Sequence, residues 1–364
     1  MGSTGDCCTS GKINEHFISS HYDLSTDSIN LLEKEGYAIH GDDSEYRSLI
    51  EFVESKNLST PANYEYVKER IDIDNFINYQ LAQIYYYNGD WPGNNIKFWK
   101  KSSGGKWRWI LYDTDFGYGL YGSSNYRHNT LAFATEPNGP TWPNPAWSTL
   151  LLRKLLANKE FKNAFVNRFA DNLNTILKPD YVEDFLGKME LKYTYEMPSH
   201  FDRWSQNMSV WNSHINIMKN FGRNRPHYIQ TQLMDRFSIE SIKQVDLNIS
   251  ETGAGKIKVN SITPWQYPWT GEYFYEIPIE LTAKPEPGYR FVRWEGSSTS
   301  TSATISMDMT SDVQLTAIFE VSEPDYRSVI IMRSVTPPAQ TPVRVTGLRF
   351  ITKEILPKTF LIGE

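Results

Sequence analysis

Apolar residues recur at helical spacing through the N-terminal part of the chain. Residues 45–55 show this spacing, Thr60 followed by Pro61 is typical of a helix start, and Asp74 is predicted to cap a third helix. The same pattern predicts four more helical stretches, the last with a break near Gly222: residues 146–157, 160–177, 179–197 and 201–234. We therefore expect a mostly helical domain over residues 12–237.

The period of the pattern changes to two at about Ser238. Alternating apolar and polar residues then predict short strands at residues 244–249, 255–259, 277–283, 289–294, 303–307 and 313–319. Their shortness and spacing indicate a small all-β domain over residues 238–321. The predicted fold class is α+β, with the helical domain first and the β-domain second.

Two short aromatic strands interrupt the helical pattern. They contain Phe98-Trp99 and Trp107-Arg108-Trp109 and are joined by a Gly-containing turn, which predicts a β-hairpin. A loop rich in Gly, Asn and Pro follows over residues 118–145, without periodicity. Loops of this length in compact domains are often functional.

Polar residues with oxygen-bearing side chains flank this hairpin. Asp90 and Asn95 precede it, and Asp113 and Asp115 follow it, the latter directly before Phe-Gly. Protein kinases place an acceptor-orienting Asp, a metal-binding Asn, a hairpin and a metal-binding Asp in this order. Carboxylate and amide oxygens suit Mg²⁺, and the first Asp would take the proton of the acceptor hydroxyl. Each part is weak evidence alone, whereas the ordered set favours a kinase-like site with a catalytic hairpin. The spacing does not choose between Asp113 and Asp115 as the main metal ligand.

The residues next to Asp90 depart from the pattern of ordinary kinases. There the catalytic Asp follows His-Arg and precedes a Lys two positions on, whereas here Asn88-Gly89 precede it and Pro92 stands in the place of the Lys. The lysine contact to the transferred phosphate therefore comes from elsewhere or is absent. Arg223 and Arg225 are candidates for a phosphate clamp, although we favour helix-to-core salt bridges for both.

Several segments of the helical part resemble the CotH kinase family, atypical kinases named after a spore-coat protein. These segments are residues 12–17, 20–22, 29–34, 41–44, 90–95, 112–117 and 221–226. The resemblance implies an ATP-dependent kinase that uses Mg²⁺ or Mn²⁺ and phosphorylates Ser or Thr of surface or coat proteins. It implies Asp90 as the catalytic residue, and Asn95, Asp113 and Asp115 as the residues that bind metal and nucleotide.

Two segments of the β-rich part are similar to a second family. Residues 285–294 and 315–319 resemble the divergent internalin-B-type repeat of bacterial surface proteins, an independent β-rich module. This resemblance implies a secreted protein that is extracellular or attached to the cell surface.

Composition narrows the range of functions further. The net charge of −6 and the lack of a Lys/Arg run argue against nucleic acid as a partner. No apolar run reaches the roughly 20 residues of a membrane span, and the residues after Met1 lack the pattern of a signal peptide. The two cysteines, Cys7 and Cys8, are neighbours, so no structural disulfide is predicted. Aromatic residues make up 14% of the chain, and besides those in the core a minority could form exposed platforms for sugars or peptides.

Both ends differ in composition from the rest of the chain. Residues 1–11 join family-like sequence abruptly, and residues 331–364 are rich in Pro, Arg and Thr, so we predict that both ends are non-native or disordered. Residues 1–11 are too few and too polar to supply the strands that cover the phosphates in a kinase, and we expect this fragment to bind nucleotide weakly. The alternative function is a catalytically inactive cell-surface binding or adhesion protein, with glycans as one class of ligand. The sequence leaves the oligomeric state open.

Overall fold

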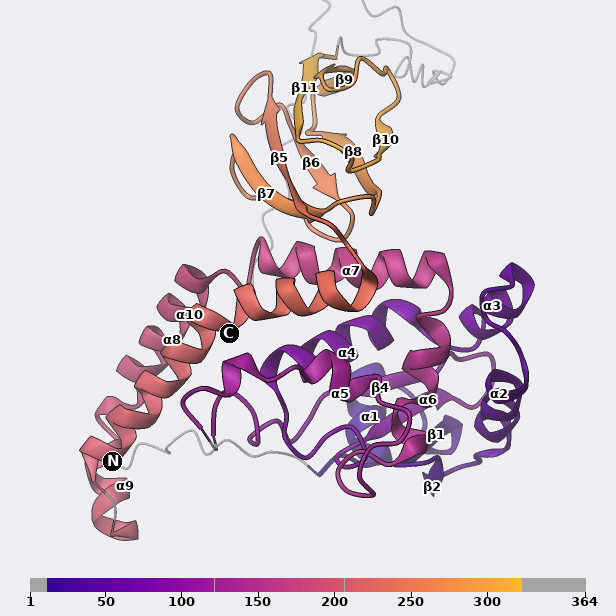
Figure 1. Cartoon of the computed structure of the whole chain (residues 1–364), viewed down its shortest axis with the longest axis vertical. Coiled ribbons are helices and arrows are strands. Elements are labelled where there is room, and N and C mark those ends of the chain that lie inside the picture. Colours follow the sequence, from indigo (N-terminus) through magenta and orange to yellow (C-terminus); the bar gives the residue numbers. More distant parts are fainter. Residues whose placement is uncertain (1–11, 121, 206, 323–364) are drawn as a thin grey trace, which may run out of the picture. The chain divides into compact units, whose positions relative to one another are not determined.

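The computed structural model describes residues 12–120, 122–205 and 207–322 (Figure 1). Helices and a four-stranded sheet form its N-terminal part, and two further sheets form its C-terminal part. The predicted α+β class is confirmed. Residues 1–11 and 331–364, for which we predicted non-native or disordered ends, lie outside the described residues.

The first helices bring the chain to the predicted hairpin. They are α1 (Glu15–Tyr22), α2 (Ser44–Ser55), α3 (Pro61–Lys68) and α4 (Ile73–Tyr86). Helix α4 is capped by Asp72 rather than by the predicted Asp74, because the Asp72 side chain accepts the backbone N–H of Asn75 at 3.0 Å. The helix ends at Tyr86, and its C-cap residue Tyr87 adopts the left-handed conformation with φ 52°.

A four-stranded antiparallel sheet carries the hairpin. Its order is β2-β1-β3-β4, with β1 (Ile29–Glu33), β2 (Tyr37–His40), β3 (Lys97–Lys101) and β4 (Arg108–Ile110). The predicted hairpin is β3–β4, in which Phe98 pairs with Trp109. The two rings stack with their centroids 5.2 Å apart, and Phe76 of α4 contacts Trp109 at 4.6 Å. These aromatic contacts fix the hairpin to α4.

The second group of helices follows the hairpin. It comprises α5 (Thr130–Ala134), α6 (Ala146–Leu155), α7 (Lys159–Leu173), α8 (Pro179–Thr194), α9 (Met197–Trp204) and α10 (Met208–Phe237). The helical part also contains two 3₁₀ turns, η1 (Thr26–Ser28) before β1 and η2 (Asn125–Arg127) before α5. The loop predicted over residues 118–145 thus contains η2 and α5. Helix α5 is too short to show a hydrophobic period, and its start depends on Asn129, whose side chain accepts the N–H of Ala132.

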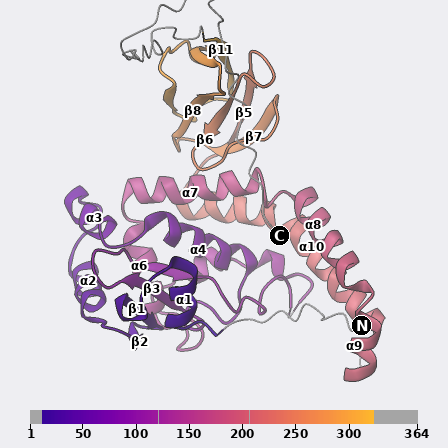
Figure 2. The same ribbon diagram turned by 180° about the vertical axis from the view of Figure 1, so that it is seen from behind.

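Helix α10 runs without the break that we predicted near Gly222. Helices α8 and α10 pack side by side in both views (Figure 1 and Figure 2). A Cβ atom at Gly222 would lie 2.5 Å from Cγ1 of Val182 in α8. The glycine therefore permits close approach of two helices. The break lies earlier in the chain, between the end of α9 and the N-cap of α10, Asn207, whose side chain accepts the N–H of Val210.

Arg225 of α10 is fully buried and ties α10 to two other segments. Its guanidinium donates to the carbonyl oxygens of Ile84 and Tyr85 at the end of α4, at 2.8 and 2.9 Å. It also donates to three oxygens of the loop before and within α5: the carbonyls of Tyr126 and His128 and the hydroxyl of Thr130. Burial lowers the pKa of Arg225 to about 10, so the side chain remains protonated at neutral pH.

The C-terminal β-domain consists of two sheets. One has the order β10-β8-β6, with β6 (Gly255–Val259), β8 (Ile279–Pro285) and β10 (Thr304–Met307). The other has the order β7-β5-β11-β9, with β5 (Ile242–Ile249), β7 (Trp269–Phe274), β9 (Tyr289–Gly296) and β11 (Val313–Val321). We did not predict β7. Gly271 interrupts its apolar alternation, and the ring of Trp269 covers that glycine.

Asp171 of α7 joins the helical part to the β-domain through hydrogen bonds. The helical part and the β-domain belong to one compact unit. The carboxylate is fully buried and accepts hydrogen bonds from the Ser261 backbone and hydroxyl, the Asn260 amide and the Tyr273 hydroxyl. Burial raises the pKa of Asp171, and these hydrogen bonds act in the opposite direction. A buried carboxylate with several donors fixes one orientation of the contact, because few other arrangements would satisfy it.

The role of Arg225 predicts a large and position-specific loss of stability. Arg225→Met keeps an aliphatic stem but leaves five oxygen acceptors without their donor, so we expect the free energy of unfolding to fall by about 3 kcal/mol or more. Arg223→Met, two residues away on the same helix, is the matched control. It removes only an exposed ion pair with Glu183 and should cost less than about 1 kcal/mol. Urea unfolding of the two variants measures both values, and equal losses would contradict the anchoring role of Arg225.

Candidate active site

The loop that carries Asp90 is bound to the segment that carries Asp113 and Asp115. Asn88, which is buried, donates to the side chain of Gln83 at 2.9 Å and to the carbonyl oxygen of Asp113 at 3.3 Å. The N–H of Gly89 donates to the carbonyl oxygen of Phe116 at 3.1 Å. The two loops on either side of the hairpin are therefore held against each other by hydrogen bonds to backbone carbonyl oxygens, which sets the spacing of their side chains.

Asp90 is a buried carboxylate with one satisfied and one unsatisfied oxygen. Its side chain is only 5% exposed, and Oδ2 accepts hydrogen bonds from Asn95 at 2.7 Å and Asn94 at 3.1 Å. Oδ1 is buried and has no hydrogen-bond partner among the described residues. Burial raises the pKa of Asp90, and the negative charges of Asp113 and Asp115 raise it further. A carboxylate with a raised pKa and an unpaired oxygen is suited to accept a proton.

Asp113 and Asp115 are exposed and lie close to each other. Desolvation raises the pKa of Asp113, and a hydrogen bond and the charge of Asp115 raise it further, while a contact with the Asn95 side chain lowers it. Asn95 thus contacts both Asp90 and Asp113. The structure brings the four predicted residues into one cluster. Both Asn95 and Asp113 have left-handed backbone conformations, with φ 51° and 53°, which only a minority of residues other than Gly adopt.

The side chains of the cluster can be compared with the ligands that Mg²⁺ prefers. Among the described residues, no group of three or more His, Cys, Asp or Glu is arranged to hold a metal ion. Two carboxylates and an amide fit Mg²⁺, which commonly keeps waters and phosphate oxygens as its other ligands. The mutual repulsion of Asp113 and Asp115 is what a divalent cation would relieve. Asn95, Asp113 and Asp115 could therefore hold the cation, with Asp90 beside it.

Two residues of the site escaped the sequence analysis. Asn88 and Asn94 orient the loop and the carboxylate of Asp90, and the only signal for them was their place beside Gly89 and Asn95. The suggested phosphate clamp is not found. Arg223 pairs with Glu183 of α8, but this salt bridge is exposed and does not reach the core as we had favoured. Arg225 is buried, and among the described residues it donates to carbonyl and hydroxyl oxygens rather than to a carboxylate.

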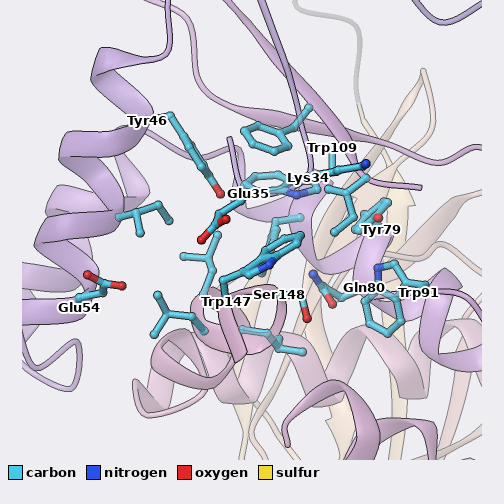
Figure 3. Close-up of a pocket in the computed structure, with 17 residues that line it drawn as sticks. Lys34, Glu35, Tyr46, Glu54, Tyr79, Gln80, Trp91, Trp109, Trp147 and Ser148 are labelled. Atoms are coloured by element: carbon cyan, nitrogen blue, oxygen red, sulfur yellow. The ribbon is translucent and has the colours of Figure 1, made fainter. Parts of the chain in front are cut away.

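Two hollows lie near residues of the acidic cluster or their neighbours in the chain. One is a small pocket beside Trp91, with Tyr79, Gln80, Trp109 and Trp147 in its walls (Figure 3). Its volume of about 80 Å³ is well below the range of about 300–1,000 Å³ typical of ligand sites. The other is an open groove of about 450 Å³, and its lining residues include Asp115, Tyr118 and Ile217. This groove combines contact with a site carboxylate and room for a ligand.

The raised pKa of Asp113 predicts a pH-dependent gain in stability for Asp113→Asn. The Asp113 carboxylate is disfavoured in the folded state, so it destabilises the fold above its folded pKa and has no effect below the unfolded value of about 3.8. Without divalent cations, Asp113→Asn should therefore have a higher Tm than the wild type at pH 7. The difference should shrink at pH 3, and thermal unfolding at the two pH values measures it.

The comparison of the two pH values is essential to this test. Asn also tolerates the left-handed conformation better than Asp, and that benefit does not depend on pH. A gain of equal size at pH 7 and pH 3 would show that the backbone, and not repulsion from Asp115, is responsible. Asp184→Asn serves as a control, because Asp184 is exposed and pairs only with Lys188 on the surface of α8.

Comparison with known proteins identifies two families along the chain. Residues 246–323 match the divergent InlB B-repeat domain, in the region of the β-domain. No curated protein and no solved structure matches the chain significantly. Residues 10–229, more than half of the 364 residues, match the family described as CotH kinase protein. This match includes the whole acidic cluster, and the chain belongs to the CotH kinase family.

Proposed function

We propose that this protein transfers the γ-phosphoryl group of ATP to a Ser or Thr hydroxyl of a protein at the cell surface. The observation that carries the proposal is the cluster in which Asn95 contacts both the buried Asp90 and Asp113, with Asp115 next to Asp113. Phosphoryl transfer depends mainly on positioning and on neutralising charge, and this cluster provides one basic oxygen and a set of metal ligands.

Each residue of the cluster has a role in this proposal. The acceptor oxygen attacks the γ-phosphorus, the bond from that phosphorus to the β–γ bridging oxygen breaks, and ADP leaves. Asp90 takes the proton of the acceptor hydroxyl at its unpaired oxygen Oδ1. Asn95, Asp113 and Asp115 would hold Mg²⁺ or Mn²⁺, and a bound cation would supply the positive charge that the phosphate groups of ATP require.

The open groove beside Asp115 supports a polypeptide acceptor. Its lining is mainly apolar and comes from three segments: Tyr86 at the end of α4, residues 114–120, and α10 through His214, Ile217 and Met218. An extended segment in this groove would bring a hydroxyl side chain close to the acids. The InlB-type repeat supports a location at the cell surface. Within the described residues, no helix is long and apolar enough to cross a membrane.

A catalytically inactive binding protein is the second candidate function. It is favoured by the absence of a lysine at the position of Pro92 and by the engagement of Arg223 and Arg225 in other contacts. In this case the cluster would bind a metal–nucleotide complex without transfer, or bind neither. The same experiment separates the two functions.

We expect Asp90 and the later acids to differ in their kinetic effects. With the full chain, radiolabelled ATP, Mg²⁺ or Mn²⁺ and a generic protein acceptor, Asp90→Ala should reduce turnover by about 100-fold or more, because it removes the proton acceptor. Calorimetric titration with Mg-ADP should show nearly unchanged affinity in this variant. Asp113→Ala and Asp115→Ala should instead weaken Mg-ADP binding, because they remove ligands of the metal.

Asp184→Ala is the control for both measurements and should match the wild type. Binding of Mg-ADP that depends on Asp113 and Asp115, without phosphoryl transfer under any condition, would support the inactive binding protein. Equal loss of Mg-ADP affinity in all three acid variants would show that the proposed division of roles is wrong.

A further inference from the structure

A separate groove lies at the junction of the helical part and the β-domain. One wall is the connection between α7 and α8, with Lys178, Asp180 and Tyr181, and the other is the loop between β6 and β7, with Trp265. The groove has a volume of about 600 Å³, within the range of about 300–1,000 Å³ of small-ligand sites. None of its lining residues belongs to the acidic cluster.

Trp265 is unusually exposed for its size. Its exposed fraction is 83%, and Tyr181 across the groove is 41% exposed, with the two ring centroids 6.3 Å apart. Trp269, half-buried, adds a third ring to the same lining. Isolated exposed apolar side chains need no explanation, whereas several large rings around one concave site indicate a binding surface.

The loop that presents Trp265 is held on both sides. Before it, Ser261 and Asn260 donate to the buried carboxylate of Asp171. After it, the hydroxyl of Tyr267 accepts the N–H of Ile257 at 2.6 Å and lies 3.2 Å from the carbonyl oxygen of the same residue. Trp265 therefore projects from an anchored loop, so that little conformational entropy would be lost when a ligand binds.

The polar groups of the groove indicate the class of ligand. Lys178 and Asp180 supply one positive and one negative charge, and neither forms an ion pair within the described part of the chain. The remaining polar side chains, such as Gln266 and Thr263, are neutral. A nucleotide or another polyanion would need an excess of cations. The balance of charge instead suits a neutral ligand with many hydroxyl groups.

Pyranose sugars combine the two properties that this groove requires. Their C–H faces are apolar and stack on aromatic rings, while their edges carry hydroxyl groups for carboxylate, amide and ammonium partners. A peptide added as a further strand is disfavoured, because Pro264 and Pro268 remove two N–H donors from the loop. We propose that this groove binds a neutral glycan, with Trp265 and Tyr181 as the stacking residues. The inference is independent of the proposed phosphoryl transfer.

The test compares matched tryptophan variants of the full chain. Wild type, Trp265→Ala, Tyr181→Ala and Trp204→Ala are first applied to a glycan array and then titrated calorimetrically with cellohexaose, maltohexaose and chitohexaose. Trp204 is the control, since it is 59% exposed but lies on α9 outside the groove. We expect at least one neutral glycan to bind, with about tenfold or greater loss in Trp265→Ala and no change in Trp204→Ala.

Three further measurements complete the test of the glycan groove: the salt dependence of affinity, the thermal unfolding of the variant and glycan binding by Asp90→Ala. Affinity should change little between 0.05 and about 0.5 M NaCl, because no net charge is recognised. Thermal unfolding of Trp265→Ala establishes that the variant is folded. Asp90→Ala should bind the glycan like the wild type, so that failure of phosphoryl transfer and failure of this proposal are distinguishable. Two results would overturn the proposal. One is equal binding of every array glycan by wild type and Trp265→Ala. The other is a groove that binds decaproline through Trp265 but binds no sugar.

Discussion

The geometry of the acidic cluster depends on a buried cation that is not part of it. Arg225 lies in the interior and satisfies carbonyl oxygens at the end of α4, which helix termini otherwise leave without partners. The same guanidinium binds the loop before α5, so three segments distant in sequence share one set of hydrogen bonds. The chain from Tyr87 to Asp90 leaves α4 at this point. A planar group with five donors can fill this role, whereas the ammonium of a lysine cannot.

The cluster itself is a case of negative charge that the fold does not neutralise. Asp90 is buried with one oxygen unpaired, and Asp115 lies close enough to disfavour the charge of Asp113. Asn95 donates to Asp90 but brings no positive charge. Such an arrangement destabilises a protein, and it is retained where the missing positive charge comes with a ligand. This unbalanced charge, more than the motif alone, distinguishes the cluster from an ordinary turn after a hairpin.

Periodicity and residue order predicted the fold class, most helices and the place of the hairpin, because these depend on local patterns of apolar residues. The predictions failed where a contact distant in sequence decides the role of a residue. Gly222 was expected to break a helix, yet it serves the close packing of α10 on Val182. Strand β7 was missed because Gly271 interrupts its apolar alternation. In the structure the ring of Trp269 covers this glycine, and the sequence does not show that contact. The four acidic-site residues could be named from their order, and the CotH relationship is confirmed. Their division into proton acceptor and metal ligands stays a prediction, and the partners of Arg225 could not be foreseen from sequence spacing.

The contacts of Asp171 show how the helical part and the β-domain are joined in one defined orientation. An apolar contact of similar size would tolerate sliding, because the hydrophobic effect has no direction. A buried carboxylate does not, since its desolvation is offset only when its donors are all in place. Asp171 receives donors from Asn260, Ser261 and Tyr273, which belong to two different segments of the β-domain. The loop of Trp265 begins at this same contact. The residue that orients the β-domain on α7 therefore also holds one end of the aromatic groove, and the shape of the groove depends on that junction.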